Sequence, residues 1–268
     1  MIEEPLLDVE GVRYVPDSPS GSAALVLAGS SGRIDRDRAR VLAAHGVLAE
    51  SIRWFGGVGQ QPGPWEVPIE LFLGRIELLA EQADRVVVFG TSFGSEAALI
   101  AGSLSPLVDA VVAFAPSDVV WSGVTPAGRA TSHWTVGGEP LPWVPFLDDW
   151  EPSEDPPAFS GLYEASRQRF ADRLPAARIP AERIPRLVLV AGADDQVWPA
   201  VIHAEAIAAT RAEHGLATDL VTDSGAGHRT ILPGEARVEG GIRMRRGGSP
   251  AADRRLGEAA WKAIERVM

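Results

Sequence analysis

Cysteine is absent from this sequence of 268 residues, and lysine occurs only once, at Lys262. The absence of cysteine excludes disulfides, a thiolate nucleophile and any cysteine-bound metal site. Basic side chains are a minority, since 25 lysines and arginines stand against 36 aspartates and glutamates, and the formal net charge is −11. Because general nucleic-acid-binding proteins present basic surface to phosphates, we expect no nucleic-acid partner.

Long uninterrupted apolar runs are also missing, so the sequence predicts no membrane span. Residues 1–5 include two glutamates where a signal peptide would carry basic residues followed by an apolar stretch. We therefore expect a cytoplasmic protein. The length and the ordinary hydrophobic content of 46% favour a single domain over residues 1–268. The sequence indicates no oligomeric state.

Apolar runs typical of strands alternate with segments of helical periodicity along the chain. Strands are expected at residues 9–15, as the opening edge strand of the sheet, and at residues 23–28, 48–55, 86–89, 108–114, 187–191 and 218–222. Helices are expected at residues 35–45 and 67–82, from residue 95 onward, and at residues 159–174, 200–214 and 251–267. This alternation predicts an α/β fold with a mostly parallel central sheet and helices on both faces.

Periodicity disappears between residues 117 and 157, a stretch rich in proline, glycine and tryptophan. A long irregular segment inside a compact domain is usually a functional excursion. We therefore predict a lid insertion over residues 117–174. Its large aromatic residues either line a ligand pocket or form the core of the lid itself. They are Trp121, Trp134, Trp143, Trp150, Phe146 and Phe159.

Residues 90–94 read Gly-Thr-Ser-Phe-Gly, which is the pattern G-x-S-x-G. The pattern lies between a predicted buried strand and a predicted helix. This is the setting of the nucleophile elbow of α/β-hydrolases, where the serine projects from a sharp and strained turn. Ser92 is therefore the candidate nucleophile. The alternative is a glycine-rich turn that only links strand to helix.

A serine hydroxyl needs a base to take its proton, and in this fold the order along the chain is Ser, then Asp or Glu, then His. Of the five histidines, only His228 lies in a glycine-flanked loop directly after the last predicted strand. His228 is therefore the candidate base, with a solvated loop histidine as the alternative.

The acid that orients this base is expected in the loop after the preceding strand, at residues 192–199. We favour Asp195, with Asp194 as a neighbour that hydrogen-bonds the turn. Asp118 is a further alternative, because some hydrolases carry their acid after the strand predicted at residues 108–114. Asp194 and Asp195 can also both be plain loop caps.

An oxyanion hole needs two N–H donors. One is expected from the backbone of Phe93, which follows the nucleophile at the start of a helix. The second should come from the turn after residues 23–28, where we favour Ser31 and then Ser30. A turn without function there is the alternative.

Several linked segments resemble one known family. They are residues 27–32, 67–72, 115–121, 134–142, 179–184, 192–199 and 225–228. They are similar to the C-terminal catalytic domain shared by acyl-CoA thioester hydrolases and bile acid-CoA:amino acid N-acyltransferases. The resemblance implies the α/β-hydrolase fold, a Ser-His-Asp triad, and no metal or cofactor. Members that conjugate acyl groups to amino acids favour cysteine as nucleophile, so Ser92 favours hydrolysis of the thioester.

The resemblance implies a small acyl thioester or ester as substrate, with an acyl-CoA as one candidate. The phosphates of coenzyme A need cations nearby. The candidates are Arg167, Arg169, Arg173, Arg243, Arg245 and Arg246, or these form a solvated face. A carboxylesterase or a lactone hydrolase of the dienelactone type would use the same triad. A ligand-binding protein without turnover is the alternative of another class.

Overall fold

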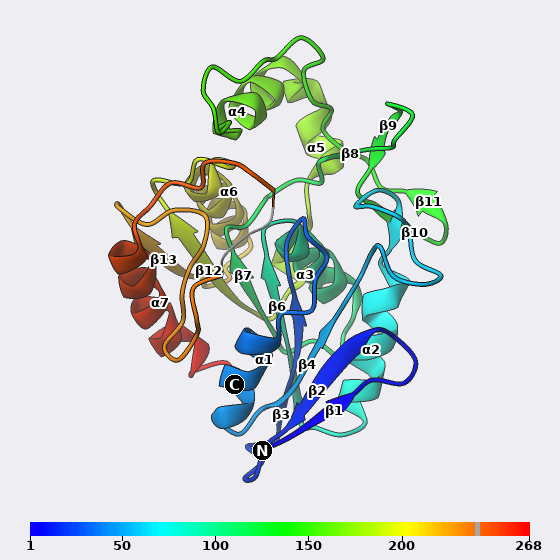
Figure 1. Ribbon diagram of the computed structural model, residues 1–268, viewed down its shortest axis with the longest axis vertical. Coiled ribbons are helices and arrows are strands. Elements are labelled where there is room, and N and C mark those ends of the chain that lie inside the picture. The colour runs from blue at the N-terminus through cyan, green and yellow to red at the C-terminus, as the bar shows by residue number, and fades with distance from the viewer. Residues whose placement is uncertain (239–241) are drawn as a thin grey trace.

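A mostly parallel β-sheet forms the centre of the computed structural model, which describes residues 1–238 and 242–268 (Figure 1). In these residues eight strands form the sheet, in the order β1-β2-β4-β3-β6-β7-β12-β13. Their bounds are β1 Ile2–Pro5, β2 Gly11–Val15, β4 Leu48–Ile52, β3 Ser22–Leu27, β6 Arg85–Thr91, β7 Ala110–Phe114, β12 Arg186–Gly192 and β13 Asp219–Asp223.

The six strands from β4 to β13 in this order pair in parallel, as predicted, whereas β2 pairs antiparallel with both β1 and β4. The strand expected at residues 9–15 was predicted to be the edge of the sheet, and this was wrong. It is β2, which pairs with β4 on one side and with β1 on the other. The true edge strand β1 is exposed along its whole length, so it carries no apolar pattern that could reveal it.

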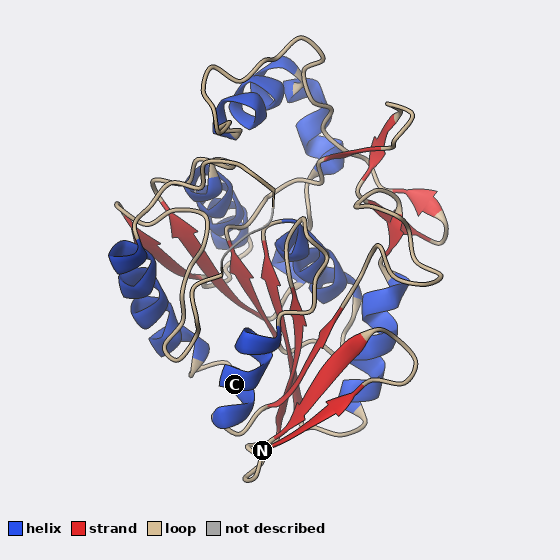
Figure 2. Cartoon of the chain, viewed as in Figure 1, coloured by secondary structure: helices blue, strands red, loops and turns tan. Residues whose placement is uncertain are grey.

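Helices cover both faces of the sheet, as Figure 2 shows. On one face lie α1 (Arg36–Ala44) and α7 (Pro250–Ile264), and on the other lie α2 (Glu70–Ala80), α3 (Phe93–Leu104) and α6 (Ala200–Glu213). Successive strand residues point to opposite faces, and β3 divides its side chains accordingly. Leu25 and Leu27 join the core with α2 and α3, whereas Ala24 and Val26 join the core with α1 and α7.

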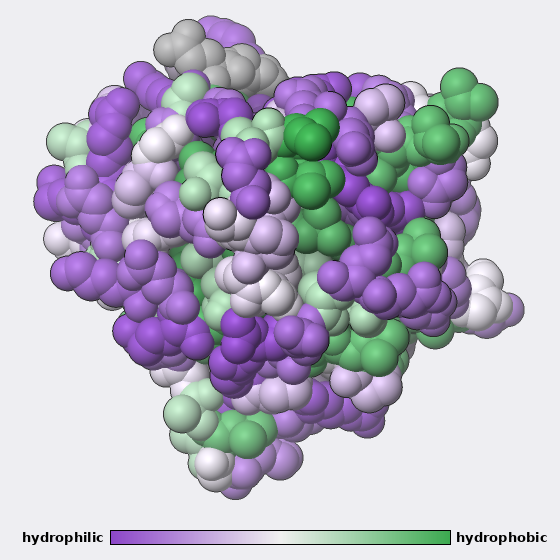
Figure 3. Space-filling view, turned by 90° about the horizontal axis from the view of Figure 1, so that it is seen from below, coloured by the Kyte–Doolittle hydropathy of each residue, from purple (hydrophilic) through white to green (hydrophobic). Residues whose placement is uncertain are grey.

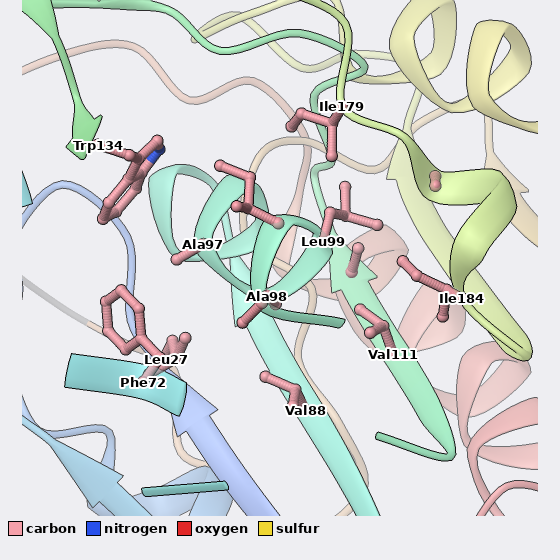
Figure 4. Packing of buried hydrophobic residues seen from close by; sticks show 14 of the residues in the cluster. Leu27, Phe72, Val88, Ala97, Ala98, Leu99, Val111, Trp134, Ile179 and Ile184 are labelled. Atoms are coloured by element: carbon pink, nitrogen blue, oxygen red, sulfur yellow. The ribbon is translucent and has the colours of Figure 1, made fainter. Parts of the chain in front are cut away.

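Helix α3 packs closely on the middle of the sheet, and it begins at the candidate nucleophile. In Figure 4 its residues Ala97 and Ala98 lie over Val88 of β6, and Leu99 lies near Val111 and Ile184. All six of these side chains are fully buried. The small alanines allow the helix to approach the strands closely, which holds its first turn in place.

The segment between β7 and β12 rises above the carboxyl edge of the sheet (Figure 1). Its strands have only two or three residues, which is too short to show periodicity: β8 Ser122–Val124, β9 Ala130–Ser132, β10 Trp134–Val136 and β11 Glu139–Pro140. Strand β10 also pairs with β5 (Val67–Pro68). Short helices follow: α4 Ser160–Arg169, η1 Ala171–Arg173, α5 Leu174–Ala177 and η2 Ala181–Arg183.

The single helix expected at residues 159–174 is therefore divided. Phe170 ends α4 with a backbone outside the helical region, at φ −110° and ψ 36°. A proline then occupies the first turn of α5, where its missing N–H costs nothing.

The face seen from below in Figure 1 is covered mostly by hydrophilic residues, with hydrophobic residues in patches between them (Figure 3). Within residues 1–238 and 242–268, no helix has the length and apolar character needed to cross a bilayer.

Leu99→Ala tests how strongly α3 depends on its packing. The side chain is 0% exposed, so truncation should lower the free energy of unfolding by about 3 kcal/mol through lost burial and the cavity left behind. Leu104→Ala, at the end of the same helix and 42% exposed, should stay within about 0.5 kcal/mol of the parent. Urea titration of both variants measures the difference, and equal losses would contradict the assigned packing.

Candidate active site

Ser92 lies in a strained turn between β6 and α3. Its backbone has φ 58° and ψ −125°, a region that residues with a side chain rarely adopt. Two glycines make the turn possible. A Cβ on Gly90 would lie 2.1 Å from the Gly94 carbonyl oxygen, and a Cβ on Gly94 would lie 2.3 Å from the Ala28 carbonyl oxygen. The G-x-S-x-G spacing thus reflects close contact between β6, α3 and the end of β3.

The turn at residues 29–32 lies directly against Ser92. A Cβ on Gly29 would come within 2.9 Å of the Ser92 Cβ, and Gly32 N–H closes the turn on the Gly29 carbonyl at 2.9 Å. In residues 1–238 and 242–268, the N–H groups of Phe93, Ser30 and Ser31 donate no hydrogen bond. The three donors predicted for an oxyanion hole therefore lie around the elbow and are not engaged elsewhere in the described chain.

His228 and Asp195 form a buried pair. The His228 Nδ1 atom lies 2.7 Å from Asp195 Oδ2. The other carboxylate oxygen, Oδ1, accepts backbone N–H groups from Val197 at 2.8 Å and Trp198 at 3.3 Å. His228 and Asp195 are 8% and 9% exposed. Because both carboxylate oxygens are engaged, the orientation of the imidazole ring is well defined.

The two loops that carry this pair are in backbone contact. A Cβ on Gly192, at the end of β12, would lie 2.3 Å from the Ala226 carbonyl oxygen in the loop of the histidine. The His228 N–H donates to the Arg246 carbonyl at 2.9 Å. Asp194 joins a third segment to these loops, since its Oδ2 accepts the Gly248 N–H at 2.7 Å, while its Oδ1 accepts the side-chain N–H of Gln196 at 3.1 Å.

Ser92 and His228 line one cavity of about 320 Å³ at the carboxyl edge of the sheet, together with residues 28–31. In the described residues no hydrogen bond joins the Ser92 hydroxyl to the His228 ring. Such bonds often tighten only in the complex with substrate. The cavity is therefore the place where a substrate would contact both side chains.

Asp118, the alternative acid, belongs to a different cluster. It pairs with Nδ1 of His203 and binds Arg167 through two hydrogen bonds of 2.8 Å. Burial alone would raise the pKa of Asp118, but the hydrogen bonds and charges of His203 and Arg167 outweigh it and hold the pKa below its ordinary value.

Other arginines considered for coenzyme A are also engaged. Arg243 pairs with Asp155 through two hydrogen bonds, and Arg245 pairs with Glu154. Arg169 and Arg173 lie on the insertion at the end of α4 and in η1. Of the six candidates, only Arg246 lines the cavity of Ser92.

The aromatic residues expected to line a pocket are absent from the described lining of this cavity. Most of them pack on one another or on neighbouring rings. Phe146 stacks on Trp121 with ring centroids 5.6 Å apart, and Trp150 lies 5.9 Å from Phe159. Tyr163 of α4 meets both Trp121 and Phe146 edge-on. This corresponds to the alternative in which the aromatic residues form the core of the insertion.

Sequence reasoning missed a buried carboxylate behind the elbow. Glu96, four residues after Ser92, is fully buried, and its Oε2 accepts Trp134 Nε1–H at 2.9 Å and lies 3.1 Å from His133 Nδ1. The His133 ring in turn lies 4.0 Å from the Phe93 ring. The signal available was an acidic residue inside an otherwise apolar helical run.

Arg38 was missed as well. It is buried, donates to the Thr91 hydroxyl at 2.8 Å next to Ser92, and pairs with Glu235. Its place in an arginine-rich helix gave no reason to single it out. In the described residues, no group of three or more histidine, aspartate or glutamate side chains could hold a metal ion.

A family model described as BAAT / acyl-CoA thioester hydrolase C terminal matches residues 67–266. The chain belongs to this family. The match includes the elbow, Asp195 and His228, while the turn at residues 29–32 precedes it. No curated protein matches the sequence.

Solved structures with the same fold include a putative dienelactone hydrolase from Klebsiella pneumoniae subsp. pneumoniae MGH 78578. It is 12% identical with a TM-score of 0.52, over 97% of this chain and 92% of that one. A lipase in its open form is 15% identical with a TM-score of 0.59, over 97% and 94%. A Mycobacterium tuberculosis puromycin-hydrolyzing peptidase is 15% identical with a TM-score of 0.54, over 85% and 36%.

At these identities the likeness shows the fold alone. Together with the family match, it makes the chain a serine hydrolase of the α/β-hydrolase fold. A binding protein without turnover is not supported.

Asp118→Asn should make the protein less stable and change its response to acid. Because the folded pKa of Asp118 is lowered, its contribution to stability is fully present above the unfolded value near 4 and is lost as pH falls through the folded pKa. Removing the carboxylate should cost about 3 kcal/mol at pH 7, the lower end for a buried ion pair, since Arg167 keeps 21% exposure. Urea titration at pH 7 and below pH 4 measures this loss of stability and its dependence on pH. A loss of the same size at all pH values would contradict the assignment.

Proposed function

We propose that this serine hydrolase cleaves small acyl thioesters, with Ser92 as nucleophile, His228 as base and Asp195 as the acid that orients it. The observation that carries the proposal is a shared cavity. Ser92, in its strained turn, and His228, paired at 2.7 Å with Asp195, both line it. Three segments far apart in the chain thus meet at one edge of the sheet.

In the first step, the Ser92 hydroxyl attacks the thioester carbonyl while Nε2 of His228 accepts its proton. Asp195 accepts the Nδ1–H of the same ring, which leaves Nε2 with a free lone pair and stabilises the imidazolium that forms. The two backbone N–H groups on Asp195 keep its carboxylate in position during the proton transfer.

Negative charge then develops on the carbonyl oxygen. The Phe93 N–H is at the first turn of α3, where helix N–H groups lack intrahelical partners and the helix dipole favours an anion. The N–H groups of Ser31 or Ser30 supply the second donor from the turn that packs against Ser92. Donors fixed in this way cost no reorganisation when the charge forms.

The thiol leaves with the proton from His228, and an acyl group remains on Ser92. Water then attacks this ester, with His228 again accepting a proton. As the acid is released, His228 returns this proton to the Ser92 oxygen, which restores the enzyme. Preference for a thioester rests on family membership, since the triad chemistry alone is equally suited to an oxygen ester or a lactone. We further propose that residues 117–174 act as a cap, because they lie above the carboxyl edge of the sheet (Figure 1).

Labelling with a fluorophosphonate tests the nucleophile and its acid. The parent protein should be labelled and Ser92→Ala should not. In a hydrolysis assay, Asp195→Asn should lose about ten-thousand-fold in kcat, because the His228 ring takes the wrong tautomer. Asp118→Asn provides the matched control, since its carboxylate pairs with another histidine, and it should retain kcat within about tenfold at neutral pH. A larger loss in Asp118→Asn than in Asp195→Asn would reverse the assignment of the acid.

A substrate panel tests the leaving group. For acyl-CoA and 4-nitrophenyl esters of the same acyl chain, kcat/KM should favour the thioester by at least about tenfold, or 1.4 kcal/mol of transition-state free energy. The opposite preference would identify the protein as a carboxylesterase, and rapid opening of lactones alone would identify a lactone hydrolase. In either case the triad would stand.

A further inference from the structure

The cavity of Ser92 and His228 is rich in arginine, although the chain as a whole carries a formal charge of −11. Arginines contributed by four different segments line it: Arg33, Arg38, Arg229, Arg237 and Arg246. Four acidic side chains line it as well, Asp35, Asp37, Glu235 and Asp253. An anionic ligand is therefore attracted only to arginines whose charge these acids do not compensate. The question is which of these charges are already compensated by acidic neighbours.

Arg38 is compensated. Its guanidinium forms a two-point ion pair with Glu235, at 2.6 and 3.1 Å, and donates to Thr91 and to the Thr230 carbonyl. Arg38 therefore holds Thr91, the residue before Ser92, and the Thr230 backbone in place at the wall of the cavity.

Within the described residues, the other acidic lining residues form no hydrogen bond to Arg33, Arg38, Arg237 or Arg246. Asp253 accepts the Gly227 N–H at 2.9 Å, and burial raises its pKa, which weakens it as a counter-ion. Asp37 lies 3.8 Å from Arg40, which is outside the cavity. Asp35 approaches Arg33 only to 3.8 Å, beyond hydrogen-bond distance.

Within residues 1–238 and 242–268, Arg237 and Arg246 form no hydrogen bond or ion pair with a carboxylate, although the charge of Arg237 acts on Asp253 from a longer distance. The Arg246 guanidinium donates only to backbone carbonyls, of Met244 at 3.2 Å and Ile242 at 2.7 Å. Its own carbonyl accepts the His228 N–H, which ties this arginine to the catalytic loop. Arg237 is exposed and makes no hydrogen bond in the described chain.

The guanidinium groups are close enough to act on one another. Burial, and then the like charges of Arg246, Arg33 and Arg237, lower the pKa of Arg229 to about 10. Bringing these cations together costs free energy. An anion bound beside Arg237 and Arg246 would offset this cost.

We propose that this cluster binds a carboxylate at the far end of the acyl chain, so that the substrates are half-esters or half-thioesters of small dicarboxylic acids. The proposal rests on the proposed function, because the reacting carbonyl must reach Ser92 in the same cavity. Guanidinium groups bind carboxylates through paired, charge-assisted hydrogen bonds. The volume of about 320 Å³ is at the small end for ligand pockets, and so suits a short acyl group better than a nucleotide.

Binding to the full-length Ser92→Ala protein tests this without turnover. Monoethyl succinate and ethyl butyrate have similar size and differ in the terminal carboxylate. Ligand-observed NMR titration should show that monoethyl succinate binds at least about tenfold more tightly, which corresponds to 1.4 kcal/mol. The preference should weaken at high salt, because the cluster is partly exposed.

Arg237→Gln and Arg246→Gln, each added to Ser92→Ala, should lower the affinity ratio of the two ligands by about tenfold. Arg237→Lys, which keeps the charge but not the paired donors, should lower it less. Arg254→Gln removes an exposed arginine of α7 that does not line the cavity, and should keep the ratio. Circular dichroism checks that each variant is folded.

Three outcomes would overturn the proposal. The first is an affinity ratio near one, and the second is a ratio that is the same in all variants. The third is loss of coenzyme A binding in Arg237→Gln and Arg246→Gln while monoethyl succinate is unaffected, which would assign the cluster to the phosphates of the leaving group. Failure of the proposed nucleophile is distinguished by fluorophosphonate labelling of the parent protein, which does not depend on the arginines.

Discussion

The strained backbone of Ser92 is the constraint on which the site depends. A residue with positive φ at the end of a buried strand persists only where its surroundings impose it. Here the surroundings are backbone atoms, because Gly90 and Gly94 leave no space for side chains and bring β6, α3 and the end of β3 into direct contact. The hydroxyl is thereby held at the carboxyl edge of the sheet, beside N–H groups that have no other partner in the described chain.

Parallel strands explain how the other groups reach the same place. The loops after β3, β6, β12 and β13 all leave the sheet at its carboxyl edge, which is where ligands bind in open α/β sheets. Close backbone contact at a glycine also occurs outside the elbow, since the contact of Gly192 with Ala226 joins the loop of Asp195 to the loop of His228. Backbone contacts thus fix the distance between proposed acid and base, and side-chain packing such as Trp198 against His228 supports the ring.

Much of the central sheet could be predicted, because its strands are buried on both faces and appear as continuous apolar runs. The elbow could be predicted because close backbone contacts require glycine at fixed positions, and this spacing is visible in the sequence. Edge strand β1 and the short strands of the insertion have no visible pattern, since exposed or two-residue strands need no apolar pattern. Glu96 and Arg38 were missed for another reason: their partners lie 25 to 197 residues away in the chain, and only the fold brings them together.

The described residues contain two Asp–His pairs, Asp118–His203 and Asp195–His228, which differ in their access to a cavity rather than in residue type. Trp198 contacts the histidine of each pair, with its ring centroid 5.9 Å from those of both His203 and His228. His203 is fully buried in α6, and in the described chain its Nε2 has no hydrogen-bond partner. A proton at that nitrogen has no route to a substrate. His228 pairs with its carboxylate through the same Nδ1 geometry, yet its ring lines the cavity that also holds Ser92. The same chemical pair therefore supports structure in one place and is suited to proton transfer in the other, because only one of them borders a space that a substrate can enter.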